Sequence, residues 1–370
     1  MASAPAVHAG LAVQQSTNKG RLVVATQAIP AQAVLMVDLP YALVPAPLSH
    51  EPPISFCCNH RCNRQASRAG LELQPRQENR DAAMQADNSR SGGPVTFISC
   101  PRQCAPEVLW CSRDCHAQDA ARHNPECAWL RSSGARARAE QGEFEFELLW
   151  LLARTSIRRH CDSNIGSEPG ENHNESVETG SAVTTSAGSS HFDRRGWDSV
   201  WDLEGSPGSF PVDEVAGWRD LTSTYLVDKI PGVECTAEQA IGLICRLETN
   251  SFGLYPGVTG DYPIKTHAGR GEYFGSGLYP TAAMFNHACC PNVSHRLDEH
   301  SRRIFTANRE IKPGEECCIS YFDLVEFRDA AVRRHEIRTK WTFGCDCQRC
   351  QDDANEGLPD FLTGLDIEND

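Results

Sequence analysis

The sequence lacks any long apolar run. The longest, Leu148 to Ala153, is far short of the ~20 residues that cross a membrane. The first residues also lack the basic stretch and the apolar segment of a secretory signal. We therefore expect no membrane association and a nuclear and/or cytoplasmic location, where thiols stay reduced.

An excess of positive charge is also missing. The 370 residues include 35 Lys plus Arg against 49 Asp plus Glu, which gives a formal net charge of −14. Broad attraction to phosphate backbones or anionic lipids is therefore not expected, and a basic partner suits the chain better. The basic stretch Arg131 to Arg138 leaves nucleic-acid binding open as a disfavoured alternative.

Common nucleotide and protease motifs are absent as well. Gly275-Ser276-Gly277 is not followed by the rest of a dinucleotide fingerprint, and the chain contains no GKS or GKT phosphate loop and no HExxH grouping. Dinucleotide-binding and nucleotide-binding functions are therefore not supported.

Cysteine, in contrast, is abundant. The chain has 18 cysteines, and in a reducing compartment such residues bind metal more often than they form disulfides. Four pairs, each separated by three residues, fall within one polar block: Cys58 and Cys62, Cys100 and Cys104, Cys111 and Cys115, and His123 and Cys127. Eight ligands predict two structural zinc sites, because one short turn can supply half of a tetrahedral site. Buried, inert cysteines are the alternative.

A later cluster supplies only three thiols, Cys345, Cys347 and Cys350. Because a closed zinc site needs four ligands, we expect Cys289 to be the fourth. Such a zinc would attach the C-terminal segment to the loop that carries Asn286. The sequence therefore predicts three zinc ions in total.

Short β-strands are predicted near both ends of the chain and helices between them. Strands are expected at Leu22–Ala25 and Val34–Val37, and again at Ile304–Ala307 and Cys317–Tyr321, the latter two flanking a Pro313-Gly314 turn. Helical spacing and caps predict helices over 143–158, 236–248 and 324–341.

Two polar segments, Asn63 to Ser99 and Asp162 to Ser209, are predicted to be unfolded insertions. Beyond Cys350 the chain carries acidic residues without a basic one. This composition favours a solvated tail over a docking element for a basic substrate.

The first cysteine block resembles the MYND zinc finger. The resemblance rests on seven cysteines and one histidine, on Trp110 to Cys115, and on His123, which three residues separate from Cys127. Ligand pairs interleave in that family, which implies one zinc on Cys58, Cys62, Cys111 and Cys115 and another on Cys100, Cys104, His123 and Cys127. The early pairs have a longer spacing than is usual in the family, so Cys57 could replace Cys58.

Further motifs resemble the SET and MYND domain family of protein lysine methyltransferases. They are Asn18 to Arg21, Asn250 to Phe252, Gly277 to Pro280, Asn286 to Asn292, Ser320 to Asp323 and Trp341 to Cys345. The resemblance implies S-adenosylmethionine as cofactor and an α+β fold with a mostly β SET core. It further implies a division into SET residues 1–57, the finger 58–127, a helical insert 128–250, SET residues 251–323 and a cysteine-rich post-SET segment 324–370.

The resemblance also implies roles for individual residues. Tyr321 would orient the lysine amine, and Tyr279 and Phe343 would be walls of the lysine channel. Methyl transfer needs a neutral amine in line with the methyl group, and an apolar aromatic channel disfavours the charged form of lysine.

Cofactor contacts are expected from Asn286, His287, Lys19, Arg21 and Asn250, with Tyr321 and Phe343 beside them. The two cations would pair with the carboxylate of the cofactor. Two departures from the family pattern are present, since Ala288 replaces the usual Ser and Leu22 replaces a usual Gly.

The sequence therefore predicts a zinc-containing, S-adenosylmethionine-dependent lysine methyltransferase whose acceptor is a histone or another lysine-bearing protein. The alternative is a non-catalytic scaffold whose finger binds proline-containing peptides. Binding of the cofactor distinguishes these two hypotheses.

Overall fold

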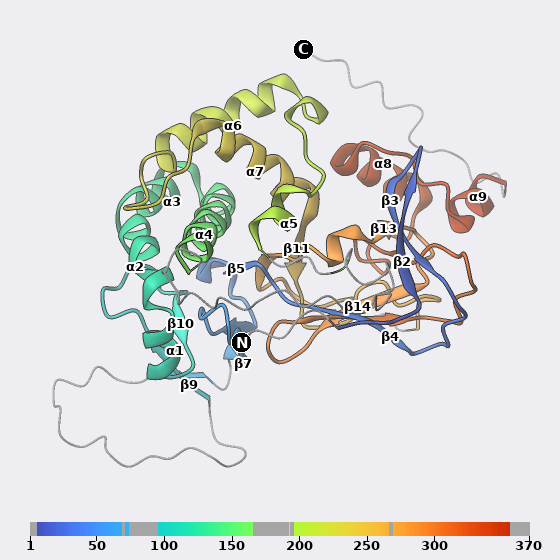
Figure 1. Cartoon of the computed structure of the whole chain (residues 1–370), viewed down its shortest axis with the longest axis horizontal. Coiled ribbons are helices and arrows are strands. Elements are labelled where there is room, and N and C mark those ends of the chain that lie inside the picture. Colours follow the sequence, from blue (N-terminus) through green and yellow to red (C-terminus); the bar gives the residue numbers. More distant parts are fainter. Residues whose placement is uncertain are drawn as a thin grey trace, which may run out of the picture.

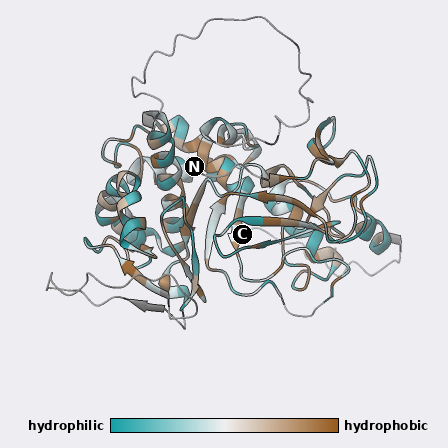
Figure 2. Ribbon diagram, turned by 60° about the horizontal axis from the view of Figure 1, so that its bottom comes forward, coloured by the Kyte–Doolittle hydropathy of each residue, from teal (hydrophilic) through white to brown (hydrophobic). Residues whose placement is uncertain are grey.

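The computed structural model describes most of the chain. The described residues are 6–68, 71–73, 95–165, 192, 196–265 and 269–355. Most of the two predicted insertions and the end of the acidic tail lie outside these residues. Most helices gather on one side of the molecule and most strands on the other, where α8 and α9 also lie (Figures 1 and 2), so the expected α+β class is confirmed.

Strands from the two ends of the chain pair with each other. A four-stranded sheet has the order β1 (Ala6–Val7), β4 (Val34–Asp38), β15 (Arg303–Ala307) and β14 (Val293–Leu297). A three-stranded sheet has the order β11 (Ser251–Leu254), β12 (Gly275–Leu278) and β5 (Ala42–Pro45). The β core is therefore assembled from two segments that are separated by the middle of the chain.

Smaller pairings complete this core. β2 (Leu11–Ser16) and β3 (Gly20–Ala25) form a hairpin whose turn ends at Gly20, with φ +68°, a conformation that favours glycine. β13 (Asn286–His287) pairs in parallel with β16 (Cys318–Ile319). The predicted Pro313-Gly314 turn is present, with Gly314 at φ +80° and Glu315 N–H donating to the Lys312 carbonyl.

The finger combines short strands with two helices. Its elements are β6 (Ile54–Phe56), β7 (Gln65–Ser67), β8 (Leu71–Leu73), β9 (Val95–Ser99), β10 (Leu109–Trp110), α1 (Arg113–Gln118) and α2 (Ala120–Trp129). The prediction that 63–99 is wholly unfolded was wrong, because β7, β8 and β9 lie within it. β7 pairs with β6, β8 with β9 and β9 with β10, so the polar segment between them contains paired strands at both ends.

The insert is helical. Its elements are a π-helical turn (Leu130–Gly134), α3 (Ala135–Gln141), α4 (Glu143–Ile165), α5 (Trp197–Trp201), a 3₁₀ turn (Pro207–Ser209), α6 (Val212–Tyr225) and α7 (Ala237–Asn250). The predicted capping box of α7 is confirmed in the side chains of Thr236 and Gln239. The prediction that 162–209 is unfolded was wrong at both ends, because α4 continues to Ile165 and α5 begins at Trp197.

Two helices follow the β core, α8 (Ala330–Trp341) and α9 (Gln348–Asn355). α8 begins later than its predicted start at Leu324, because Asp329 caps its first turn by accepting from Ala331 N and Val332 N. Two 3₁₀ turns, Leu48–His50 and Ala282–Met284, complete the described elements. None of the described helices has both the length and the apolarity needed to cross a bilayer.

A buried ion network joins the finger, the insert and the β core. Glu126 of α2 is completely buried and accepts from Arg122, from Trp150 and, at 2.6 Å, from Arg154 Nε. Arg154 of α4 also donates to the carbonyl of Leu43 in β5. Buried charges are tolerated only when they are paired, so this network fixes how the three parts pack.

Candidate active site and metal centres

The structure brings sulfur and nitrogen atoms of Cys and His side chains together in three groups. Within each group, these atoms all lie within 4.8 Å of one another. The groups are Cys57, Cys62, Cys111 and Cys115; Cys100, Cys104, His123 and Cys127; and Cys289, Cys345, Cys347 and Cys350. Tetrahedral zinc with Zn–S of ~2.3 Å places its sulfurs roughly 3.8 Å apart. The nearest sulfur pairs, at 3.5 to 3.9 Å, match this spacing, so the three groups fit zinc.

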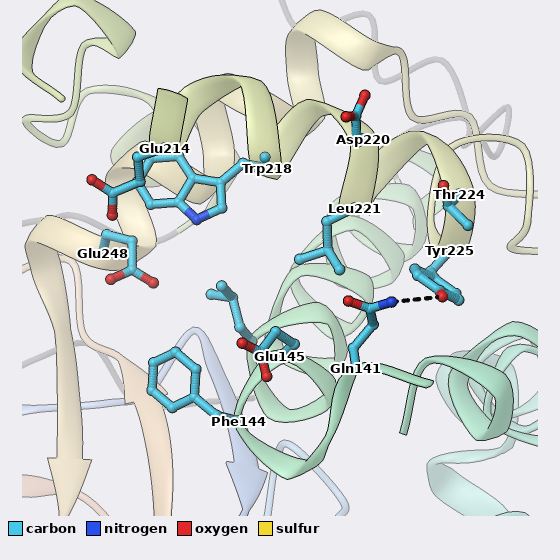
Figure 3. A pocket seen from close by; sticks show the side chains of 12 residues that line it. Gln141, Phe144, Glu145, Glu214, Trp218, Asp220, Leu221, Thr224, Tyr225 and Glu248 are labelled. Carbon is cyan, nitrogen blue, oxygen red and sulfur yellow. Dashed lines mark hydrogen bonds between the residues drawn. The ribbon is translucent and has the colours of Figure 1, made fainter. Parts of the chain in front are cut away.

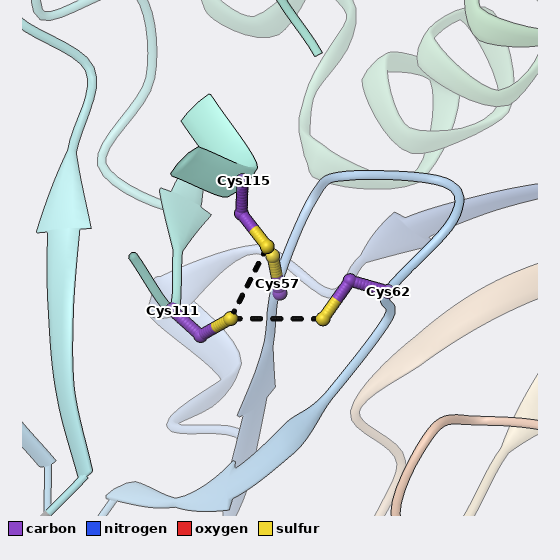
Figure 4. A group of neighbouring side chains, drawn as sticks. All are labelled: Cys57, Cys62, Cys111 and Cys115. Atoms are coloured by element: carbon purple, nitrogen blue, oxygen red, sulfur yellow. Dashed lines mark hydrogen bonds between the residues drawn. The ribbon is translucent and has the colours of Figure 1, made fainter. Parts of the chain in front are cut away.

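The first group contains Cys57 in place of the predicted Cys58 (Figure 4). Cys58 is buried beside Arg122 and Glu126, and Arg122 donates to its carbonyl. The Cys58 thiol is thus used in packing, and burial raises its pKa above the ordinary value. The prediction of Cys58 as a ligand was wrong, and the alternative, Cys57, occupies the position.

The second group contains the four predicted ligands and a carboxylate behind its histidine. His123 Nε2 lies 3.3 Å from Cys100 Sγ, while His123 Nδ1 lies 3.2 Å from Glu126 Oε2. A carboxylate that accepts from one ring nitrogen leaves the lone pair of the other nitrogen for the metal. Glu126 therefore orients the metal ligand in addition to joining the three parts of the fold.

The third group attaches the segment before α9 to the loop after β13. Cys289 Sγ lies 3.9 Å from Cys345 Sγ and 3.6 Å from Cys350 Sγ. His287 contacts this group, with Nε2 at 3.3 Å from Cys289 Sγ. Its Nδ1 accepts from the backbone N–H of Tyr321 at 3.1 Å, which requires the Nε2–H form of the ring. One imidazole therefore connects a metal thiolate to the predicted catalytic tyrosine.

Tyr321 lies two residues after β16, with its ring between aromatic neighbours. Its hydroxyl donates to the carbonyl of Phe285 at 3.0 Å, and burial raises its pKa. The ring centroid of Trp341 lies 5.1 Å away and that of His287 lies 5.2 Å away. The sequence analysis did not single out Trp341 as a site residue, although its place four residues before Cys345 was a usable signal.

Tyr279, the other tyrosine with a predicted role, lies in the packed β core. Its side chain is completely buried, and its hydroxyl donates to the carbonyl of Ser301 at 2.6 Å. The guanidinium of Arg303 lies 4.8 Å from its ring centroid. Tyr279 thus packs in the β core, and its role as a wall of the lysine channel stays a prediction.

Lys19 and Asn286 meet at Glu316, a residue that the sequence analysis did not identify. Asn286 Nδ2 donates to Glu316 Oε1 and to the carbonyl of Arg21, both at 2.9 Å. Lys19 Nζ lies 3.4 Å from Glu316 Oε2 and 3.3 Å from Asp346 Oδ1. The β2–β3 hairpin, the strand β13 and the third cysteine group are therefore brought together.

Arg21 and Asn250 both contact the loop after α5. Arg21 Nη1 pairs with Asp202 Oδ2 at 2.5 Å, and Asn250 Nδ2 donates to the carbonyl of Glu204 at 2.6 Å. This loop lies in the segment that was predicted to be unfolded, which explains why sequence reasoning missed Asp202.

Phe343 keeps 37% of its surface exposed, and its ring centroid lies 6.2 Å from that of His287.

Comparison with known proteins yields one family match and several relatives. The SET domain model matches residues 20–322. The potential protein lysine methyltransferase SET6 of Saccharomyces cerevisiae is 38% identical over 80 residues, covering 22% of this chain and 21% of that protein. The histone-lysine N-methyltransferase SMYD3 of Mus musculus is 39% identical over 175 residues, covering 45% of this chain and 36% of that protein.

The chain is also similar, over a longer alignment, to a SET and MYND domain-containing protein of Dictyostelium discoideum. The two are 24% identical over 358 residues, which cover 93% of this chain and 60% of that protein. The chain thus spans less than two thirds of the length of each of these relatives.

Zinc content tests which neighbouring cysteine is a ligand. We expect Cys57→Ser to lower the zinc content from three ions per chain to two, because it removes a thiol of the first group. Cys58→Ser is the matched control and should keep three ions, since its thiol lies in the core. Metal analysis of the purified variants measures this. The reverse pattern, with zinc lost only in Cys58→Ser, would contradict the assignment.

Proposed function

Because the chain belongs to the SET domain family, we propose that it is a protein lysine N-methyltransferase that uses S-adenosylmethionine. The observation that carries the proposal is the position of Tyr321, which His287 connects to the third cysteine group and which packs on Trp341. Histones and other lysine-bearing proteins are both acceptors of a suitable class.

The residues around Glu316 fit the proposed cofactor. S-adenosylmethionine supplies an electrophilic methyl group on a sulfonium. Lys19 and Arg21 offer cations for its carboxylate, which would compete with Asp346 and Asp202 for them. Phe343 offers a partly exposed ring for a flat base, and aromatic faces suit a sulfonium.

Tyr321 can orient the acceptor amine. Burial raises its pKa above the ordinary value, so the hydroxyl stays neutral and donates its hydrogen to the Phe285 carbonyl. The lone pairs of the hydroxyl oxygen are then free to accept an N–H of the lysine amine. That hydrogen bond would aim the nitrogen lone pair at the methyl group, and the ring of Trp341 would help exclude water.

Replacing the tyrosine tests the proposal. We expect Tyr321→Phe to lower methyl transfer by about 10²-fold or more, since the amine loses its orienting acceptor. The assay incubates the protein with radiolabelled S-adenosylmethionine and a whole-cell lysate and identifies the methylated lysines. Tyr255→Phe, in which the altered ring lies against Tyr273 and Arg270, is the matched control and should keep full activity.

Cofactor binding separates this proposal from the scaffold alternative. S-adenosylmethionine at 100 times its Kd should stabilise both the wild type and Tyr321→Phe by about 2.7 kcal/mol. An unchanged melting temperature of the wild type, together with no labelled lysine, would favour a non-catalytic scaffold.

The proposed nucleophile also predicts a pH dependence. The pKa of a free lysine amine is near 10.4, so its neutral fraction rises about tenfold per pH unit below that value. Because burial raises the pKa of Tyr321, its hydroxyl should not ionise between pH 7 and 9. We expect kcat/KM to rise over this range in steady-state assays. The substrate is an unmethylated peptide that contains the acceptor lysine identified in the lysate experiment. A fall between pH 7 and 9 would contradict the proposed roles.

A further inference from the structure

A groove of about 500 Å³ lies on the helical insert (Figure 3), and none of its lining residues belongs to the three cysteine groups. It is formed by α4, α6, α7 and the end of α3. Its lining residues are Gln141, Phe144, Glu145, Leu148, Glu214, Gly217, Trp218, Asp220, Leu221, Thr224, Tyr225 and Glu248. The volume is that of typical ligand pockets, so the groove can hold side chains of another molecule.

The charges of the groove have a single sign. Four lining residues are acidic, namely Glu145, Glu214, Asp220 and Glu248, and none is Lys, Arg or His. None of the four carboxylates forms an ion pair with another described residue. Burial, together with the charge of Glu214, raises the pKa of Glu248, while the charge of Lys340 acts in the opposite direction.

Apolar side chains lie among these carboxylates. Trp218 packs edge-on against Phe210, with ring centroids 5.0 Å apart, and is thereby held in place. Phe144 keeps 73% of its surface exposed. In the view of Figure 3 the carboxylate of Glu248 lies between the rings of Trp218 and Phe144. Lysine and arginine combine an apolar stem with a cationic end, and this lining suits both parts.

One lining residue of the groove, Glu248, is influenced by α8, the helix that ends at Trp341. Glu248 is in the last turn of α7, and the charge of Lys340 in α8 acts on its carboxyl group. The next residue, Trp341, has its ring 5.1 Å from that of Tyr321. The end of α7 that carries Glu248 is thus within electrostatic reach of the helix that carries Trp341.

We propose that this groove binds a basic segment of the acceptor protein that adjoins the lysine to be methylated. This proposal rests on the proposed function. The helices around the groove would select acceptor proteins that carry lysine or arginine residues near the methylated lysine. Lysine or arginine side chains of the segment lie along Trp218 and Phe144 and pair with Glu214 and Glu248. The net charge of −14 also favours encounter with a basic segment.

A labelled peptide tests the binding without any methyl transfer. The probe is a fluorescein-labelled peptide of repeated Lys-Leu-Ala, measured by fluorescence anisotropy in the absence of S-adenosylmethionine. The double variant Glu214→Lys/Glu248→Lys reverses two groove charges. The control Asp213→Lys/Glu238→Lys makes the same change in net charge on the same two helices, at exposed residues outside the groove.

We expect the groove variant to bind the peptide about tenfold or more weakly than the wild type, and the control to bind within about twofold of it. Circular dichroism establishes that both variants are folded. Equal weakening in both variants would overturn the proposal, because it would mean general charge attraction. Failure of the wild type to bind the peptide would also overturn it.

Methyl-transfer assays on the same variants separate this inference from the proposed function. A raised KM with unchanged kcat in the groove variant, for the acceptor found in the lysate, supports the inference. Equal KM in the groove variant and the wild type overturns the inference and leaves the proposed function standing. Groove-dependent peptide binding without methyl transfer by the wild type overturns the proposed function and keeps the groove as a site for basic peptides.

Discussion

The arrangement of the proposed active site depends on the group of four thiols that attaches residues 345–350 to Cys289. The strands beside it, β13 and β16, have only two residues each and form few backbone hydrogen bonds. Structural zinc contributes ~10 to 16 kcal/mol in small fingers, which exceeds the net stability of many domains. A metal in this group would thus hold the loop more strongly than the local strand pairing does.

His287 transmits this constraint to the chemistry. Its Nε2 faces a thiolate of the group and its Nδ1 accepts from Tyr321 N–H, so the ring can satisfy both partners only in one orientation and one tautomer. Lys19 adds a second connection from the hairpin, because it pairs with Asp346 between two cysteines of the group. Two segments distant in sequence therefore position the same tyrosine.

Local sequence patterns predicted the elements that depend on local interactions. The capping box of α7 and the Pro313-Gly314 turn were predicted because each depends on four neighbouring residues. Cysteine spacing predicted two zinc sites in the finger, since each pair comes from one short turn, whereas the interleaving of the pairs was implied by the family resemblance. The spacing could not decide between Cys57 and Cys58, because that choice depends on which side chain faces the buried Arg122 and Glu126.

Features that depend on long-range packing were not predicted. The order β1-β4-β15-β14 joins segments separated by most of the chain, and no local pattern specifies such pairing. Tyr279 and Tyr321 both belong to aromatic motifs, yet only the fold distinguishes a hydroxyl bonded to Ser301 in the core from one beside Trp341. Asp202 and Trp218 become site residues only because α5 and α6 pack against α7.

Cofactor binding by a variant of the third group tests the central claim most directly. Titration calorimetry with S-adenosylmethionine would compare the wild type, Cys350→Ser and the control Cys161→Ser, whose thiol lies outside the three groups. The account predicts that Cys350→Ser loses one zinc and measurable cofactor affinity, while Cys161→Ser binds as the wild type does. Wild-type affinity in a Cys350→Ser protein that has lost one zinc would contradict the claim that this metal group assembles the site.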